Sequence, residues 1–336
     1  MAGICLIAYA VGSVIRFNIK NVEPLLRDSP PKATLIFERA SDFAIIIAYI
    51  ISVCLYLHIM SAFVLSDLHV DTILNEDVLT TATIAIITLI GIIKGLKNLE
   101  FLEQWALYIT LVIIIALMFG FANYDWQSWN SVSGIILPSP LNHSTWEIVT
   151  IVAGTLIVVQ GFETTRYLGN IYQRQDRITA SNWSQLISTV VYITFIALAL
   201  PLLHTLNGKY DDDSLIALVL VASSVLVIPL VIAASLSQFS AAVADTLASA
   251  GNIQEVTQSK LKEKWAYLIV GVTAIILTWT ANTYELVSLA SRAFAFYYML
   301  QCFVAISISH SLFQRIAMSI LACLLGFITI FAVPAG

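Results

Sequence analysis

Apolar runs alternate with short polar gaps along the chain, and this pattern predicts ten membrane crossings. Most runs reach the length of about 20 residues that a helix needs to cross a hydrocarbon core of about 30 Å. In lipid the backbone must satisfy its own hydrogen bonds, so each run is expected to be helical. The expected spans are 3–17, 41–66, 79–93, 103–122, 146–168, 184–206, 215–248, 265–281, 285–309 and 314–333.

The lysine and arginine residues are distributed unevenly between alternate gaps. Thirteen lie in or directly beside the gaps that follow odd-numbered spans, whereas the gaps that follow even-numbered spans contain only Lys209. The thirteen are Lys20, Arg27, Lys32, Arg39, Lys94, Lys97, Arg166, Arg174, Arg177, Lys260, Lys262, Lys264 and Arg315. Because short cytoplasmic loops carry an excess of lysine and arginine, the odd gaps are expected in the cytoplasm and the even gaps outside.

Composition supports a bundle embedded in the lipid bilayer of a cell or plasma membrane. Hydrophobic residues make up 59% and charged residues 11%, whereas soluble domains carry about a quarter charged residues. No loop is long enough for a separate soluble domain, so the expected fold is all-α, a single polytopic domain over 1–336. No nucleic-acid-binding patch is visible. The four cysteines lie in apolar spans, where they are expected to pack rather than bind metal. They are Cys5, Cys54, Cys302 and Cys323.

The start of the chain raises a question of topology. The charge pattern places Met1 outside, and run 3–17 is short, with no basic residue before it. It therefore makes a poor signal peptide. These features favour an N-terminally truncated version of a protein with eleven or more spans. The alternative is a first helix that inserts with its N-terminus outside.

Three segments carry further local expectations. The gap 18–40 is polar and contains three prolines, so it is expected to be a cytoplasmic loop, and 169–183 is expected to be another. The gap 123–145 contains Trp126 and Trp129 and suits an outer loop at the lipid interface. Run 215–248 is too long for a simple crossing, and Pro229 is expected to kink it.

The most informative polar segment within an apolar run is Gln160-Gly161-Phe162-Glu163-Thr164, in the fifth run. Glycine lowers helix propensity by about 1 kcal/mol, and a carboxylate in lipid costs several kcal/mol unless it is paired or hydrated. Both costs are acceptable if the helix breaks here and its free backbone groups line a site for a charged solute or ion. The alternative is a close helix crossing at Gly161, with Glu163 at the cytoplasmic headgroups.

This stretch resembles the sixth helix of permeases in the amino acid–polyamine–organocation (APC) superfamily, in which a Gly-Phe-Glu segment often marks the point where that helix unwinds. The resemblance covers most of the chain by helix order, but only 160–164 is specific. It implies a leucine-transporter-type fold of two inverted five-helix repeats around a central substrate site. Span 3–17 would then match the family's second helix, so the first helix, which supplies half of that site, would be absent.

The resemblance also ranks the other polar residues within spans. Tyr56 shares a helix face with Ser52 and resembles a substrate-contacting tyrosine. His58 could couple transport to protons because histidine titrates near neutral pH, or it could simply bond a neighbouring helix. Ser235 and Ser237 resemble part of a sodium site, although serine also mediates ordinary helix packing.

Arg292 is a further candidate because it lies within span 285–309. An arginine within a membrane usually pairs with an acid or lines an aqueous path. It is expected either to hold a substrate carboxylate or an outer gate, or to form a structural ion pair, with Glu163 as one possible partner.

The sequence therefore predicts a secondary active transporter that moves a small polar solute, such as an amino acid, by alternating access. Sodium or protons would drive it, and no other cofactor is expected. No nucleotide-binding or catalytic motif is visible, which argues against a pump driven by ATP alone and against an enzyme. The alternatives are a channel or a truncated or non-transporting membrane subunit.

Overall fold

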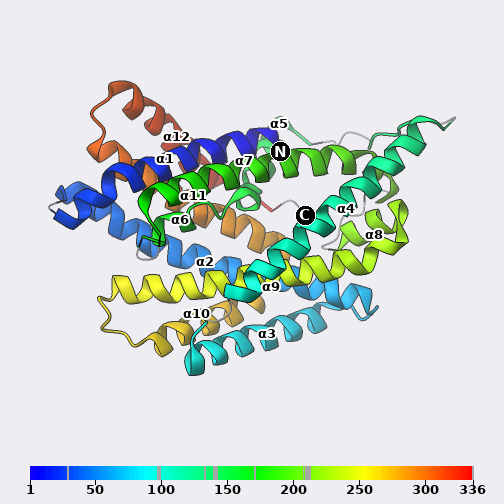
Figure 1. Ribbon diagram of the computed structural model, residues 1–336, viewed down its shortest axis with the longest axis horizontal. Coiled ribbons are helices and arrows are strands. Elements are labelled where there is room, and N and C mark those ends of the chain that lie inside the picture. The colour runs from blue at the N-terminus through cyan, green and yellow to red at the C-terminus, as the bar shows by residue number, and fades with distance from the viewer. Residues whose placement is uncertain are drawn as a thin grey trace.

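The computed structural model describes residues 1–28, 30–96, 100–131, 134–138, 143–169, 172–206, 208 and 213–334. All elements in these ranges are helical (Figure 1). The long helices are α1 (Ala2–Asp28), α2 (Lys32–Asp67), α3 (Ile73–Lys94), α4 (Glu100–Trp129), α7 (Arg174–Ala199), α9 (Val227–Val256), α10 (Glu263–Thr278), α11 (Thr283–Ile308) and α12 (Leu312–Phe331). The short ones are α5 (Thr145–Ala153), η2 (Leu156–Val159), α6 (Thr164–Tyr167), η3 (Leu200–Leu206), α8 (Ser214–Ala222) and η4 (Ser224–Leu226).

Eight helical segments of the described chain are long and apolar enough to cross a membrane. The other two expected crossings are the 16-residue α10 and the interrupted segment α5–η2–α6. The chain is therefore an integral, multi-pass membrane protein. All ten apolar runs correspond to helical segments, but several boundaries differ from those expected.

The loops expected at 18–40, 123–145 and 169–183 are shorter than the sequence suggested. Helix α1 continues to Asp28 and α2 already begins at Lys32. Likewise, α4 continues to Trp129 and α7 begins at Arg174. Polar residues on the extensions of α1, α2 and α7 bond other helices, which explains how these three helices extend past their apolar runs. Positions 132–133 and 139–142 of the expected outer loop lie outside the described residues.

The seventh run is broken rather than kinked at Pro229. Helix α8 ends at Ala222, Ser223 is extended with φ −169°, and α9 starts at Val227 after one 3-10 turn. Pro229 is thus the third residue of α9. A proline in the first helical turn sacrifices no helical hydrogen bond, because those N–H groups have no partner within the helix. The break therefore precedes the proline.

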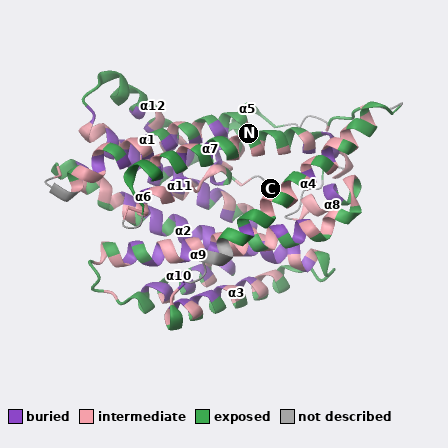
Figure 2. Ribbon diagram, viewed as in Figure 1, coloured by how far each residue is buried: buried purple, intermediate pink, exposed green. Residues whose placement is uncertain are grey.

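Helices α2 and α11 form the centre of the bundle and are buried along most of their length, whereas α3, α4 and α7 expose much of their surface (Figure 2). Three packed pairs relate runs that are five apart in the sequence: α1 with α7, α2 with α9, and α3 with α10. Runs five apart cross the membrane in opposite directions. This pairing is the arrangement that two inverted five-helix repeats produce.

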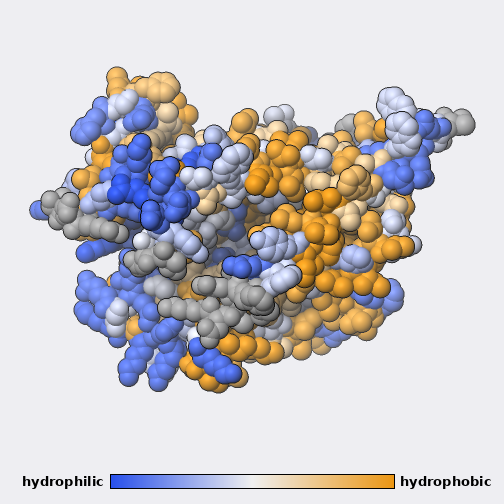
Figure 3. Space-filling model, in the orientation of Figure 1, coloured by the Kyte–Doolittle hydropathy of each residue, from blue (hydrophilic) through white to orange (hydrophobic). Residues whose placement is uncertain are grey.

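The gaps expected on one side of the membrane meet in the structure. A charged cavity is lined by residues from the end of α1, the start of α2, the end of α6 and the end of α9. At the opposite end, Ser66 donates a hydrogen bond to Asp213, and the Trp279 indole donates to Thr81 at 3.0 Å. Hydrophilic side chains gather at the left end of the view in Figure 3, beside a broad apolar surface.

A buried amide network joins α1, α2 and α11. The Asn18 amide donates to the Gln301 carbonyl at 2.9 Å and to its side-chain oxygen at 2.8 Å. The Gln301 amide in turn donates to Ser41 at 2.8 Å. All three side chains are fully buried. The network therefore holds the extended end of α1 against the two central helices.

Replacing Gln301 by leucine is expected to destabilise the bundle by about 1–2 kcal/mol, because Asn18 and Ser41 lose buried partners. The apparent melting temperature in detergent measures the effect. Ser13→Ala is the control, since the Ser13 hydroxyl donates to the Ala10 carbonyl of its own helix. An equal melting temperature for Gln301→Leu and the control would contradict the network's role.

The charge distribution also makes a topology prediction for the link between α9 and α10. A single cysteine at Lys262 should react with a membrane-impermeant thiol reagent only from the cytoplasmic face, because that segment is rich in lysine. Sealed cells and inverted vesicles provide the two arms of the experiment. Labelling from the outside in intact cells would reverse the topology.

Candidate functional site

The fifth run is a discontinuous helix. Helix α5 begins with a capping box, in which Ser144 and Glu147 exchange hydrogen bonds, and it ends at Ala153. After one 3-10 turn, Gln160 is extended and Gly161 has φ +114°, before α6 starts at Thr164. Only glycine adopts that φ readily, because it has no Cβ. The expected break is therefore confirmed, and the alternative of a continuous helix that merely crosses a neighbour at Gly161 is not.

Ser291 of α11 satisfies the backbone on the outer side of the break. Its hydroxyl donates to the Gly154 carbonyl at 2.6 Å and accepts from the Ile157 N–H at 3.0 Å. Both backbone groups would be satisfied within the run by a continuous helix. In lipid, an unpaired backbone group costs several kcal/mol. Ser291 avoids this cost, because its hydroxyl supplies both hydrogen bonds that the interrupted helix lacks.

Glu163 closes the inner side of the break and is fully buried. One of its carboxylate oxygens accepts hydrogen bonds from the Gly161 N–H and from the Tyr298 hydroxyl, both at 2.8 Å. The other oxygen, Oε1, has no hydrogen-bond partner among the described residues. The Thr164 hydroxyl donates to the Gly161 carbonyl at 2.8 Å. A buried carboxylate with an unused oxygen can accept a proton, a cation or a donor group of a solute.

Gln160 faces a cavity of about 240 Å³ between the break, α1 and α7. Its amide nitrogen donates to the Tyr56 hydroxyl of α2, and its oxygen has no hydrogen-bond partner in the described chain. No lysine, arginine or carboxylate is among the residues that line this cavity. Its polar lining also includes Tyr9, Ser184, Gln185, Ser188, Thr189 and Tyr192.

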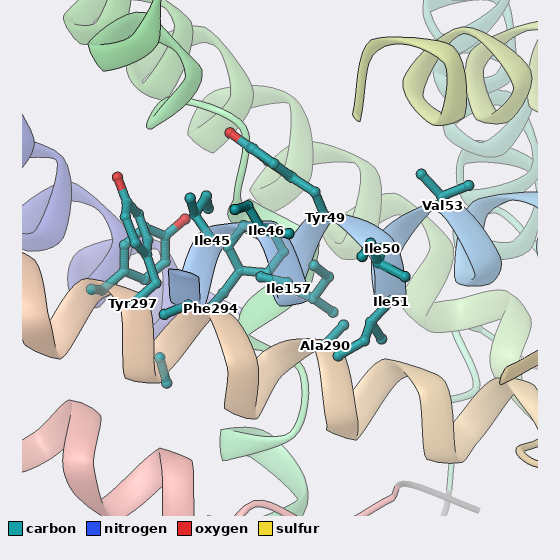
Figure 4. Close-up of a cluster of buried hydrophobic side chains, with 14 of the residues drawn as sticks. Ile45, Ile46, Tyr49, Ile50, Ile51, Val53, Ile157, Ala290, Phe294 and Tyr297 are labelled. Atoms are coloured by element: carbon teal, nitrogen blue, oxygen red, sulfur yellow. The ribbon is translucent and has the colours of Figure 1, made fainter. Parts of the chain in front are cut away.

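Apolar contacts fix the break between the two central helices. The Phe162 ring stacks on Tyr298 of α11, with ring centroids 5.5 Å apart and planes 15° apart. Ile157 lies in a buried cluster with Ile46 and Tyr49 of α2 and Phe294 of α11 (Figure 4). The unwound segment therefore packs against both central helices.

The structure brings Tyr56, Gln160, Gly161, Phe162, Glu163 and Thr164 together, and these residues form the candidate site. It does not bring Arg292 into the group, because its guanidinium donates to the Ala332 and Ile330 carbonyls at the end of α12, at 2.8 and 3.3 Å. The suggested Arg292–Glu163 pair is absent from the described residues. A substrate role for Arg292 stays a prediction.

The three proposed ion-coupling residues lie elsewhere. His58 is buried between α2 and α3 and contacts Asp77 at 3.2 Å, the bond to a neighbouring helix that the sequence offered as an alternative. Ser235 has a buried hydroxyl without a hydrogen-bond partner in the described chain, and Ser237 is half-buried on the same helix. No group of three His, Cys, Asp or Glu side chains in the described residues could hold a metal ion.

Sequence reasoning gave no role to Ser291 and Tyr298, which hydrogen-bond the broken segment, or to Tyr49. Tyr49 has a fully buried hydroxyl without a hydrogen-bond partner in the described part of the structure. It precedes Tyr56 by seven residues, so the two lie on one helix face, and that spacing was an available signal. Ser291 and Tyr298 are also seven apart. Their contact with the break could be recognised only from the fold.

A multi-pass helical bundle with a discontinuous crossing at its centre is typical of membrane transporters built from inverted repeats. A family model described as "APC superfamily transporter" matches residues 1–332. An uncharacterized protein of Aquifex aeolicus (strain VF5) is 36% identical over 339 residues, which cover 98% of this chain and 82% of that protein. The chain belongs to the APC superfamily of transporters.

Ser291→Ala is expected to lower the stability of the bundle by about 1–3 kcal/mol, because it leaves the Gly154 carbonyl and the Ile157 N–H unpaired. The apparent melting temperature in detergent measures this loss. Ser288→Ala is the control, since Ser288 is also buried on α11 but bonds the Glu285 carbonyl of its own helix. Equal melting temperatures for the two variants would show that Ser291 does not support the break.

Proposed function

We propose that this protein is a secondary active transporter that binds a small polar solute, such as an amino acid, at the break in the fifth run. The observation that carries the proposal is the pairing of an unwound backbone with Gln160 and Glu163, each of which keeps an oxygen unbonded in the described structure. Membership of a transporter family supports the same conclusion.

The size and chemistry of the cavity support a small polar solute. About 240 Å³ is less than the roughly 300–1,000 Å³ of pockets for drug-sized ligands. Hydroxyl and amide groups dominate its polar lining, and these groups can both donate and accept hydrogen bonds. Such a lining suits a compact molecule with several polar groups.

The coupling ion is proposed to be a proton or sodium. Glu163 is the carboxylate at the break, and its unused oxygen can take up a positive charge together with the solute. A charged carboxylate is costly in an interior without water. Binding of the cation at Glu163 and binding of the solute would therefore strengthen each other. His58, Ser235 and Ser237 stay secondary candidates for the coupling ion.

Uptake of a panel of labelled amino acids into proteoliposomes, with imposed sodium or pH gradients, tests the proposal. Glu163→Gln should abolish accumulation against a gradient, because the neutral amide cannot gain or lose the coupling charge. Gly161→Leu should lower uptake at least about tenfold, because leucine strains the backbone at φ +114° and enters the cavity.

Glu263→Gln on α10 is the matched control and should transport normally, because Glu263 lies at the start of its helix and away from the break. Unchanged uptake in Glu163→Gln and Gly161→Leu, in a protein that transports, would place the site elsewhere. Solute flux that never exceeds equilibrium in any gradient would favour a channel.

A further inference from the structure

The short helix α6, on the inner side of the break, is connected to three other helices by two buried arginines. Arg166 lies on α6 itself, and Arg177 lies on α7. Both side chains are at least nine-tenths buried. Buried arginines are rare unless they are paired, so their partners indicate what the two charges do.

Arg166 pairs with Glu38 of α2. Its guanidinium donates to a Glu38 carboxylate oxygen at 2.5 Å, and the side chains are 3% and 12% exposed. The pairing is incomplete, because the Arg166 Nη1 and the second Glu38 oxygen are buried without hydrogen-bond partners among the described residues.

Arg177 binds the end of α6 and α1 at the same time. Its guanidinium donates to the Thr165 and Arg166 carbonyls, both at 3.0 Å, and so satisfies backbone groups at the C-terminal end of α6. It also forms two hydrogen bonds with the Glu23 carboxylate, at 2.8 and 2.6 Å. A helix of four residues cannot satisfy these carbonyls by itself.

A charged cavity of about 640 Å³ lies next to these ion pairs, on the side expected to face the cytoplasm. Glu23, Glu38, Asp42 and Arg166 line it. Ile46 follows Asp42 by one helical turn and is buried, and Tyr49 follows it with a fully buried ring. The ion pairs therefore lie between the open cavity and the interior below the break.

We propose that the Arg166–Glu38 ion pair is the latch that holds the cytoplasmic side of the transport path closed, while Arg177 and Glu23 keep α6 attached to α7 and α1. When Arg166 and Glu38 separate, α6 moves away from α2 about Gly161, whose positive φ and open surroundings make it the pivot. This movement joins the charged cavity to the Glu163 region. The inference rests on the proposed transport function, and it adds the residues that position α6 and the exit that they close.

The test measures access to a cysteine at Ile46, in full-length protein whose native cysteines are replaced. The probe is a small, charged methanethiosulfonate reagent applied to the cytoplasmic face of inverted vesicles. Glu38→Gln and Arg166→Gln should each raise the labelling rate at position 46 at least about tenfold, within the roughly 5- to 150-fold range of typical coupling energies. The exchanged pair, Glu38→Arg with Arg166→Glu, should bring the rate back toward that of the parent.

Arg39→Gln is the matched control. Arg39 lines the same cavity, is exposed, and has no carboxylate within ion-pair distance in the described residues, so its removal should leave the rate unchanged. A second reporter cysteine at Phe121, buried in a separate cluster with α8, should stay unreactive in every variant.

Three outcomes would overturn the latch: no increase at position 46 over the control, an increase at positions 46 and 121 alike, or exposure that the exchanged pair does not reverse. Labelling does not measure solute movement. A protein without detectable uptake, but with the expected pattern at position 46, would therefore contradict the proposed function and not the latch.

Discussion

The structure depends on one constraint, which is that a helix interrupted inside a membrane must find other partners for its free backbone groups. Three side chains meet this need for the fifth run. Ser291 bonds both sides of the outer turn, Glu163 accepts the Gly161 N–H, and Arg177 binds the carbonyls that end α6. Each comes from a different part of the chain. These side chains therefore stabilise the break within the bundle.

The same constraint explains why the centre of the protein combines apolar packing with isolated polar groups. The rings of Phe162, Phe294 and Tyr298 pack around the break. Gln160 and Glu163 each have a side-chain oxygen with no hydrogen-bond partner among the described residues. Leaving these oxygens unbonded is costly in such apolar surroundings, so a solute or ion that bonds them is stabilised more strongly than it would be in water. A ligand that bonds these oxygens can drive a conformational change when the outward-open and inward-open states expose the oxygens unequally.

Sequence patterns predicted the helical class, the two charge-sorted ends and the break at Gly161, because hydropathy, charge and glycine each act locally. They did not predict the lengths of α1, α2 and α7. The polar ends of these helices are stabilised by distant partners, such as Glu23 for Arg177 and Gln301 for Asn18, which no local pattern reveals. Arg292 shows the same limit. Its position within a span suggested a substrate-binding or gating role, whereas in the structure it hydrogen-bonds a carbonyl at the end of α12.

A cysteine scan through positions 150–168, read as reactivity toward a small thiol reagent, tests the central claim most directly. The account predicts a helical period of about 3.6 residues up to position 153, and loss of that period between 154 and 163. Reactivity that keeps one helical period through the whole range would contradict the discontinuous crossing.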